Sequence, residues 1–545
     1  MSDILRPGET CWRIERASRM AMIVDAADYF LALREAVRSA KRAVYMVGWD
    51  FDLRIDMTPG QEGDANGNAD DGMPRHLGDF IVAVAKENPD LDLHILKWDG
   101  AMLASIGKQV VPTILLQLFS DHNIHFALDS HHPLGACHHS KIVVIDDELA
   151  FCGGIDATED RWDTSEHKPD DPRRTRPDGS PHEPWHDVTA CLEGPVARAL
   201  GDLSRRRWHK ATGEELEPCA GGSPGSAKPG SSALWPDRLE PNFRDVDVAI
   251  ARTEPRYHGD PLVNEIEELY LAAIRAAKET IYLESQYLAA GSLCDALEAR
   301  LQEPDGPELV VVNPQSALSF MEDEAMHSVR ARMIRRLRDA DTGGRFRIFY
   351  PANSAGTPIY VHAKVLAIDD RLLRLGSSNV DNRSMGFDTE CDVAVEASSE
   401  GERQTILDFR HRLLAEHMGC EVDDVARAAE EHGSLVGVVE ALNGRADRQL
   451  KAIEPEPLDP LEVALADSRL FDPRYYDEDS YDLSDRMKHK AKRAVSPYHV
   501  SASLGGTALV ALIGAGAVGF GVYALLRRRK RSELAAPAII HHRTL

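Results

Sequence analysis

Two short stretches of the chain carry the same reactive side chains at the same spacing. The first stretch, residues 139–156, contains His139, Lys141 and Asp146, followed by Gly153, Gly154 and Asp156. The second stretch, residues 362–379, contains His362, Lys364 and Asp369, followed by Gly376, Ser377 and Asn379, with every internal spacing kept. Two such copies in one chain are poorly explained by a chance match.

Paired histidines and lysines are suited to cleaving a phosphodiester. That reaction needs a nucleophile, an acid for the leaving alkoxide, cations for the phosphoryl oxygens and accurate positioning, which together supply on the order of 20 kcal/mol. An imidazole with a pKa near 6.5 can be neutral or protonated at neutral pH, so we expect one histidine in each state. The two motifs provide all of these groups, so we expect no metal and no organic cofactor.

Each motif is predicted to be a β-hairpin. Alternation along a strand puts His139 and Lys141 on one face, and the apolar residues 142–145 are typical of a buried strand. The polar residues 146–148 predict a turn, after which residues 149–151 return as the next strand. The hairpin then brings its Gly-Gly or Gly-Ser loop back to the histidine. Small residues there would let backbone amides approach an anionic group.

A helix followed by a strand precedes each motif. Residues 26–41 predict an amphipathic helix and 43–49 a buried strand, and residues 265–278 and TIYLES repeat this pair. Between them we predict helices 77–87 and 108–120 and strands 91–97 and 123–128. This alternation indicates α/β layers around a mixed or mainly parallel sheet. The repeat favours an internal duplication, although alanine-rich helices also resemble one another by composition.

The pattern divides the chain into seven segments. We predict an N-terminal domain (1–212), a linker (213–240), a C-terminal domain (241–418), a helical extension (419–450), an acidic then basic linker (451–499), a hydrophobic segment (500–526) and a basic tail (527–545). The hydrophobic segment has no charged residue, and its 27 residues would span about 40 Å as a helix. We interpret it as a transmembrane helix; the alternative is a buried or surface-lying hairpin.

Small residues at four-residue intervals, Ala511, Ala515 and Gly519, would let two such helices pack as a homodimer. Five basic residues flank the segment on each side, so charge does not decide its orientation. The amino terminus lacks an apolar stretch of signal-peptide length, so we expect the catalytic part to face the cytoplasm.

The overall composition limits the partners. The formal net charge of -26 opposes a nucleic-acid partner, because phosphate binding depends on lysine and arginine. The eight cysteines include no C-x-x-C pair, which suggests a reduced compartment or inert buried thiols. The histidines near the motifs, His131, His132, His138 and His186, show no metal-ligand spacing.

The twin H-x-K-x-x-x-x-D motifs resemble those of the phospholipase D superfamily. The segments GGIDATEDRWDT (153–164), PWHDVTACLEGP (184–195), IYLESQYL (281–288), IYVHAK (359–364) and GSSNVDNRSMGFDTE (376–390) resemble its phospholipid-cleaving branch, closest to eukaryotic-type enzymes. Together the similar segments cover roughly residues 10 to 418. The resemblance implies two duplicated α/β/α domains related by pseudo-twofold symmetry, with one site at their interface.

The resemblance also implies roles for individual residues. His139 would attack phosphorus and His362 would protonate the leaving group, while Lys141 and Lys364 hold the phosphoryl oxygens. Asn379 would assist them. Asp156, an acceptor, would orient a lysine or histidine instead. Asp187 would orient His362 and Glu390 would orient His139, each across the interface, next to the small loop residues Gly154 and Ser377. Asp146 and Asp369 complete the catalytic motifs, and we expect them to brace the hairpins.

The charged segment 161–187 has two interpretations, a solvated loop or a loop bordering the substrate mouth. In the second, Arg173, Arg174 and Arg176 are candidates for contact with the lipid head group or the membrane surface.

We therefore predict a membrane-anchored phospholipase D that cleaves glycerophospholipids to phosphatidic acid, with water or an alcohol as acceptor. The alternatives are a cardiolipin synthase-like phosphatidyltransferase, a nuclease of the same superfamily and a non-catalytic membrane scaffold. The acidic composition opposes the nuclease, and the two intact His-Lys pairs oppose the scaffold.

Overall fold

The computed structural model describes residues 4–100 except 62, 65 and 66, together with 123–219, 233–316, 320–455 and 472–474; between 320 and 327 only the backbone is described. Residues Met1–Gln315 and Ser328–Tyr476 form one compact unit that contains both motifs. The boundaries that we predict between domains remain predictions.

A single mixed sheet runs through this unit. Its amino-terminal half consists of β4 (Ile124–Asp129), β3 (Asp92–Trp98), β2 (Ala43–Gly48), β5 (Ile142–Ile145), β6 (Leu149–Gly153), β8 (Val188–Glu193) and β1 (Arg13–Val24), in that order. Its carboxy-terminal half continues with β9 (Phe243–Glu254), β17 (Glu390–Glu396), β16 (Leu372–Gly376), β15 (Val365–Ile368), β11 (Thr280–Glu284), β12 (Glu308–Val312), β13 (Phe346–Ala352) and β18 (Gln449–Ala452). The short strand β10 (Val263–Asn264) pairs with β9.

Apart from β10 and β18, the strand order and the sense of pairing are the same from either end of the sheet. In each half three strands lie parallel, β2-β3-β4 and β11-β12-β13, and the motif hairpin joins them in antiparallel fashion. This order is the one that a duplication predicts, and the common origin of the halves remains a prediction.

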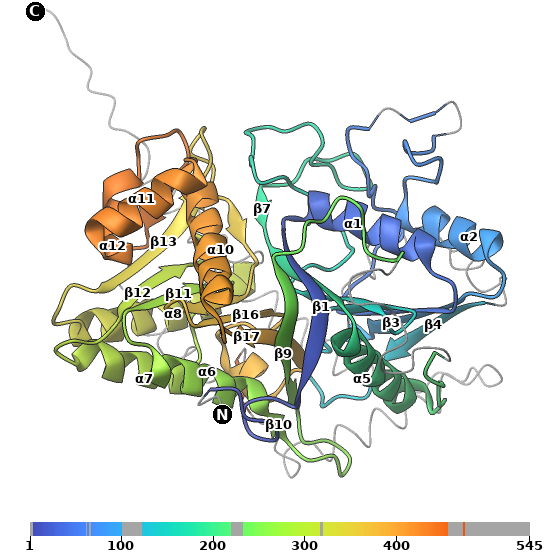
Figure 1. Cartoon of the computed structure of the whole chain (residues 1–545), viewed down its shortest axis with the longest axis horizontal. Helices are drawn as coiled ribbons and strands as arrows, with labels where there is room; N and C mark the ends of the chain where they lie inside the picture. Colours follow the sequence, from blue (N-terminus) through green and yellow to red (C-terminus); the bar gives the residue numbers. More distant parts are fainter. Residues whose placement is uncertain are drawn as a thin grey trace, which may run out of the picture. The chain divides into compact units, whose positions relative to one another are not determined.

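Strands β1 and β9 join the two halves. They pair antiparallel from Arg13 opposite Ile250 to Met20 opposite Phe243, and Figure 1 shows them side by side, β1 in dark blue and β9 in green. A second, two-stranded link pairs β7 (Trp185–His186) with β14 (Tyr360–Val361) in parallel. The predicted halves therefore share one continuous sheet.

Helices cover the sheet around three apolar cores. Helices α1 (Ala26–Ser39) and α2 (Leu77–Glu87) close the core of the amino-terminal half. Helices α6 (Glu265–Ala276), α7 (Gly291–Gln302) and the later part of α8 (Phe320–Ala340) close that of the carboxy-terminal half. A third core takes residues from both halves and includes α5 (Pro195–Thr212), α10 (Glu400–Met418), α11 (Val422–His432) and α12 (Leu435–Leu442).

Most helices and strands that we predict around the motifs are present, including both hairpins. One expectation is wrong in part: the helical extension that we predict for residues 419–450 ends at Leu442 and is followed by strand β18, which extends the sheet beside β13.

The predicted helix 108–120, most of the acidic and basic linker, the segment 500–526 and the basic tail lie outside the described residues. Within the described residues, no helix combines the length and the apolar character needed to cross a membrane.

Candidate active site

The two motif histidines are held by backbone contacts with the opposite half of the chain. The amide of His139 donates to the carbonyl of Thr389 (2.9 Å), and the amide of Thr389 donates to the carbonyl of Cys137 (3.0 Å). The amide of His362 donates to the carbonyl of His186 (2.8 Å), beside the β7-β14 pair. Each histidine therefore lies against the segment that carries the acid of the other half.

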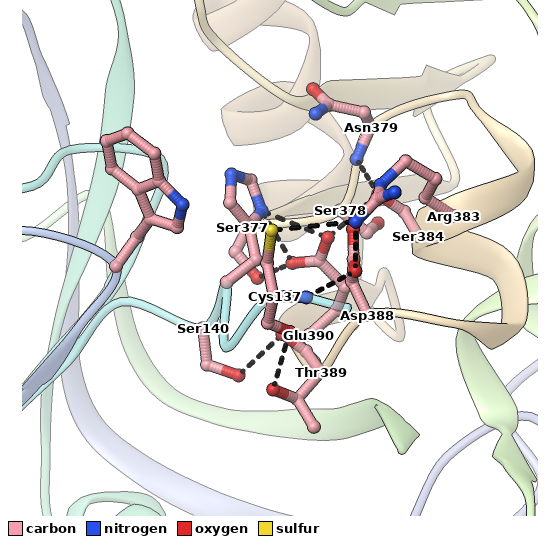
Figure 2. A network of polar contacts seen from close by, with 12 residues as sticks. Cys137, Ser140, Ser377, Ser378, Asn379, Arg383, Ser384, Asp388, Thr389 and Glu390 are labelled. Atoms are coloured by element: carbon pink, nitrogen blue, oxygen red, sulfur yellow. Dashed lines mark hydrogen bonds and ion pairs between the residues drawn. The ribbon is translucent and has the colours of Figure 1, made fainter. Parts of the chain in front are cut away.

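His139 contacts the carboxylate of Glu390, the first residue of β17. Both carboxylate oxygens lie 3.0 Å from His139 Nδ1. Ser377 and Ser384 donate their hydroxyls to the same carboxylate at 2.5 and 2.7 Å, and Figure 2 shows the two serines beside Glu390. The carboxylate is thus fixed from two sides, which fixes the orientation of the His139 ring.

His362 contacts Asp187, which lies between β7 and β8. The distance from His362 Nδ1 to Asp187 Oδ2 is 2.6 Å. The amide of Val188 donates to the other carboxylate oxygen at 2.8 Å. Both cross-interface contacts are those that the resemblance implies, and the catalytic roles of the four residues remain predictions.

The two motif lysines have different surroundings. Lys141 lies 3.1 Å from the carboxylate of Asp156, whose second oxygen accepts from the amide of Trp49. Lys364 has Asn379 at the position that matches Asp156, and no carboxylate of the described residues lies within 4 Å of its ammonium. Each ammonium donates to the carbonyl of its own motif histidine. Asp156 therefore orients a lysine, and Lys364 retains an unbalanced positive charge.

Burial and neighbouring cations favour the uncharged imidazoles. Burial, Lys141 and Lys364 lower the pKa of His139 well below its usual range. Burial, Lys364 and Arg161 do the same to the pKa of His362. Desolvation and the lysines therefore oppose a positive charge on either ring in the free site, and the protonation of one histidine during the reaction remains a prediction. A bound phosphodiester anion would restore proton affinity.

The other groups of the site also favour their neutral forms. Burial raises the pKa of Glu390 to about 8, although Lys141 and the serine hydroxyls oppose the change. Burial also raises the pKa of Asp187, against the charge of Lys364. Burial lowers the pKa of Lys364 to about 7, with Asp187 acting in the opposite direction. The protonation of these three groups should therefore respond to an incoming anion.

Asp146 and Asp369 lie at the far turns of the hairpins. The carboxylate of Asp146 accepts from the amides of residues 41, 42 and 43 at 2.7 to 2.9 Å, immediately before β2. Asp369 accepts from the amides of residues 278, 279 and 280 at 2.7 to 2.9 Å, before β11. A four-residue strand, about 13 Å long, separates each aspartate from its lysine. Both aspartates therefore brace the hairpins, and their place among the catalytic residues is corrected.

The small residues after the hairpins do not offer their backbone amides to an anionic group, contrary to what the sequence led us to expect. The amide of Gly154 donates to Val188 O (2.9 Å), and that of Ser377 to Asp392 Oδ1 (3.0 Å). These amides are therefore not available to an anionic ligand. A Cβ on Gly154 would lie 2.1 Å from the Asp187 carboxylate. Glycine leaves room for the acid that contacts His362, while Ser377 supplies a hydroxyl to Glu390.

Asn379 is buried at the loop position predicted for it. Its amide donates to Ser384 Oγ at 3.0 Å, and its side-chain oxygen has no hydrogen-bond partner among the described residues. Figure 2 shows Asn379 at the edge of the network around Glu390. A phosphate contact from Asn379 remains a prediction.

The segment 161–187 is packed into the protein rather than simply solvated. Trp162, Asp163, His167 and Arg174 are all buried. Arg174 bonds to Asp163 at 3.1 Å, so our suggestion that it contacts lipid is wrong. Arg173 and Arg176 are half-exposed and pair with Asp171 and Asp160.

Sequence analysis missed an aromatic group beside His362. The Trp185 ring lies 5.1 Å from the His362 ring and stacks on Tyr360 at 4.6 Å between ring centroids. The guanidinium of Arg161 lies 4.2 Å from the centre of Trp185. Arg161 and Trp185 fall inside the segments similar to phospholipases D, and that is the only sequence signal for them.

One further set of buried side chains could hold a metal ion. Ligand atoms of Asp25, His167, His186 and Glu416 lie within 4.8 Å of one another, and His186 also meets Glu284 and His417 in a second set. The carboxylates of Asp25 and Asp163 raise the pKa of His167 to about 9 despite its burial. The histidines and carboxylates of this set therefore neutralise one another as ion pairs. Of the four histidines considered from sequence, His186 alone belongs to it, while His131, His132 and His138 make separate contacts.

Two family models match the part of the chain that carries these residues. The model described as "Phospholipase D" matches residues 36–300, which include the first motif. The model described as "Cardiolipin synthase, PLD-like domain" matches residues 270–411, which include the second motif.

Individual relatives are distant. Phospholipase D alpha 1 of Vigna unguiculata is 22% identical over 533 residues, and that of Zea mays is 22% identical over 529 residues; each alignment covers 73% of this chain and 64% of the relative. This chain thus spans less than two thirds of their length. Among solved structures, the phosphatidylserine synthase of Haemophilus influenzae Rd KW20 aligns with a TM-score of 0.49 and 12% identity, covering 89% of this chain and 95% of that one.

Proposed function

The chain belongs to the phospholipase D superfamily, and from this premise we propose that it hydrolyses the distal phosphodiester bond of glycerophospholipids to phosphatidic acid and a head-group alcohol. One observation carries the proposal: two buried histidines, each held by a carboxylate of the other half, lie close enough that both motif lysines act electrostatically on each ring. The resemblance to eukaryotic-type phospholipases D and the names of the plant relatives support a lipid substrate.

In the first step His139 is the nucleophile. Glu390 accepts a hydrogen bond from the N–H at His139 Nδ1, which leaves the lone pair of Nε2 available to phosphorus. Burial and the two lysines keep the ring neutral, as a nucleophile requires. Lys364, which has no carboxylate within 4 Å among the described residues, is the stronger candidate for binding the phosphoryl oxygens.

The leaving alkoxide takes its proton from His362. The negative charge of the bound phosphodiester raises the proton affinity of this ring, and Asp187 stabilises the imidazolium from the Nδ1 side. After the alcohol departs, neutral His362 accepts a proton from water, which attacks the phosphohistidine and releases phosphatidic acid. A primary alcohol in place of water would give a phosphatidyl alcohol.

The proposal is tested with purified protein and a panel of phospholipids, with and without a primary alcohol. We expect phosphatidic acid from at least one lipid and diversion of product when the alcohol is added. His139→Ala and His362→Ala should each lower turnover by a factor of about 10³ or more while the protein stays folded. Wild-type turnover in either variant would contradict the mechanism.

A phosphatidyltransferase is the second candidate. The match of residues 270–411 to the cardiolipin synthase family model favours it, and the chemistry differs only in the acceptor. Phosphatidylglycerol as the sole lipid separates the two functions. Cardiolipin without phosphatidic acid would support transfer and exclude hydrolysis as the main reaction.

We also propose that residues 500–526 anchor the enzyme in a membrane, with the catalytic part on the cytoplasmic side. The uncharged 27-residue stretch and its basic flanks support this proposal. Fractionation of the full chain and of a chain ending at residue 476 tests it. We expect a buffer wash to release the shortened chain from the membrane fraction and to leave the full chain behind. Equal release of both chains would contradict the anchor.

A further inference from the structure

Arg161 is a buried arginine with no acidic partner among the described residues. Its residue is 8% exposed, and no carboxylate of the described residues lies within 4 Å of its guanidinium. The hydrogen bond recorded for it runs to the carbonyl of Glu159, at 3.2 Å. Arg174, which is also buried in the same segment, has Asp163 as its partner. Because an unpaired buried charge is costly, the position of Arg161 needs an explanation beyond packing.

The ring of Trp185 connects Arg161 with His362. The guanidinium carbon lies 4.2 Å from the centre of the indole, and the indole lies 5.1 Å from the imidazole at an angle of 37°. Trp185 is itself fixed, because its amide donates to Asp163 (2.9 Å) and its backbone pairs with Tyr360. Guanidinium, indole and imidazole therefore follow one another in a rigid series.

The charges around His362 leave a positive excess. Lys141, Lys364, Arg161 and His139 act on His362 electrostatically, and Asp187 is its carboxylate partner. Asp156 balances Lys141. Lys364 and Arg161 both lack a carboxylate within 4 Å among the residues described, and the carboxylates of Asp187 and Glu390 act on Lys364 only from a longer distance. A phosphodiester anion bound between the motifs would remove the excess.

We infer that Arg161 is a positioning residue of the phosphoryl site, which holds the His362 ring through Trp185 and provides part of the positive charge that attracts the anionic phosphate. This inference rests on the proposed function of the site and adds a third cation to its two lysines. The effect on His362 is consistent with it, since burial, Lys364 and Arg161, in that order, lower the pKa of this ring. The neutral imidazole is the form that can accept a proton from water.

Two substitutions separate the charge of Arg161 from its packing. Arg161→Met keeps an unbranched stem over Trp185 and removes the charge, so it should fold and be at least as stable as the parent. Arg161→Lys keeps the charge and loses the planar contact. Arg13→Gln is the control, because Arg13 also lies over a tryptophan, Trp12 at 3.6 Å, but pairs with Asp202 and is outside the site.

The readout is the titration of His362 in the full chain, measured by hydrogen–deuterium exchange at imidazole C2 with mass spectrometry, with and without inorganic phosphate. We expect the midpoint of His362 to move to higher pH in Arg161→Met and to stay near that of the parent in Arg161→Lys and Arg13→Gln. Affinity for phosphate should fall about tenfold in Arg161→Met alone.

Circular dichroism checks that Arg161→Met is folded. The inference is overturned if this folded variant has the same His362 midpoint and the same phosphate affinity as the parent. A midpoint that moves equally in Arg161→Met and Arg161→Lys would assign the effect to packing and overturn the role of the charge. Neither readout uses lipid turnover. If the protein does not cleave the proposed lipids, the effect of Arg161 on His362 can still be measured. If Arg161 has no such effect, the proposed lipid cleavage is still open to its own test.

Discussion

Replacing Glu390 by glutamine should lower the activity of the protein and raise its stability. In the structure the Glu390 carboxylate accepts from His139 Nδ1 and from the hydroxyls of Ser377 and Ser384. Glutamine has nearly the same shape, but its amide nitrogen can only donate. Facing His139, the amide would place the ring proton on Nε2, the nitrogen that must attack phosphorus.

The loss of activity follows from that change of tautomer. When an orienting acid is replaced by its amide in a triad of the serine-protease type, turnover falls by about 10⁴ because the wrong nitrogen is protonated. We expect a loss of about 10³ to 10⁴ in kcat for Glu390→Gln, with a much smaller change in KM, since the lysines that bind the phosphoryl group are untouched.

The gain in stability follows from the buried acid. Burial raises the pKa of Glu390 from 4.5 to about 8. The folded protein then holds this proton more tightly than the unfolded chain, so between about pH 4.5 and 8 the free energy of unfolding falls as pH rises. At pH 7 the buried acid lowers the free energy of unfolding by about 3 kcal/mol. Glutamine does not titrate, so the variant should be more stable than the parent by up to that amount.

Urea unfolding of both proteins at several pH values from 4.5 to 8 measures this difference, and it should vanish toward pH 4.5. Glu396→Gln is the control: Glu396 ends the same strand, pairs with Arg371 away from the site, and should retain activity. Full turnover in Glu390→Gln would refute the tautomer argument. A stability difference independent of pH would refute the assignment of a raised pKa.

Four other substitutions test separate contacts in and around the site. Asp187→Asn should lower turnover of natural lipids by about 10³ through His362. It should affect far less the burst rate at which a p-nitrophenyl phosphodiester releases p-nitrophenolate, because that leaving group needs no acid; an equal loss in the burst rate would argue against the acid role. Asp146→Ala and Asp369→Ala should each cost about 2 to 4 kcal/mol in urea unfolding, because three amides lose their acceptor, and the folded protein should keep its KM; a specific loss of kcat without destabilisation would return these residues to catalysis. Asp472→Ala should lower thermal stability, since the Asp472 carboxylate accepts from the Asn382 side chain and the Arg383 amide at the start of α9 (Asn382–Gly386). An unchanged melting temperature would contradict that anchoring role.

The motif hairpins were predictable because their signals are local. An apolar run of four residues, a polar turn and a returning strand are all readable within about fifteen positions of His139. Helix α1 and strand β2 were predictable for the same reason. Strands β1 and β9 were not predicted. Many residues in the first half of each strand are polar, and the pairing joins residues more than two hundred positions apart.

The candidate site depends on long-range contacts that composition and periodicity cannot supply. The pairs His139 with Glu390 and His362 with Asp187 came from the family resemblance, and the structure places both within hydrogen-bonding distance. Arg161 was overlooked because its segment is charged and rich in proline, which suggests a loop. Its burial depends on Trp185, whose ring position only the folded chain reveals.

The buried set around His186 was missed for a related reason. Its four ligands come from four separate segments, so no spacing in the sequence connects them. The lowered pKa values of both motif histidines were also beyond sequence reasoning, because they depend on burial and on lysines of both halves acting at one place.

The central claim, that one imidazole from each half acts on the same phosphorus atom, is tested most directly with phosphatidyl-p-nitrophenol and the His362→Ala variant. The substrate needs no acid, so the variant should release one p-nitrophenolate per molecule in a burst and then stop, with the phosphatidyl group found on His139 by mass spectrometry. Steady turnover without a burst, or a label on any other residue, would contradict the account.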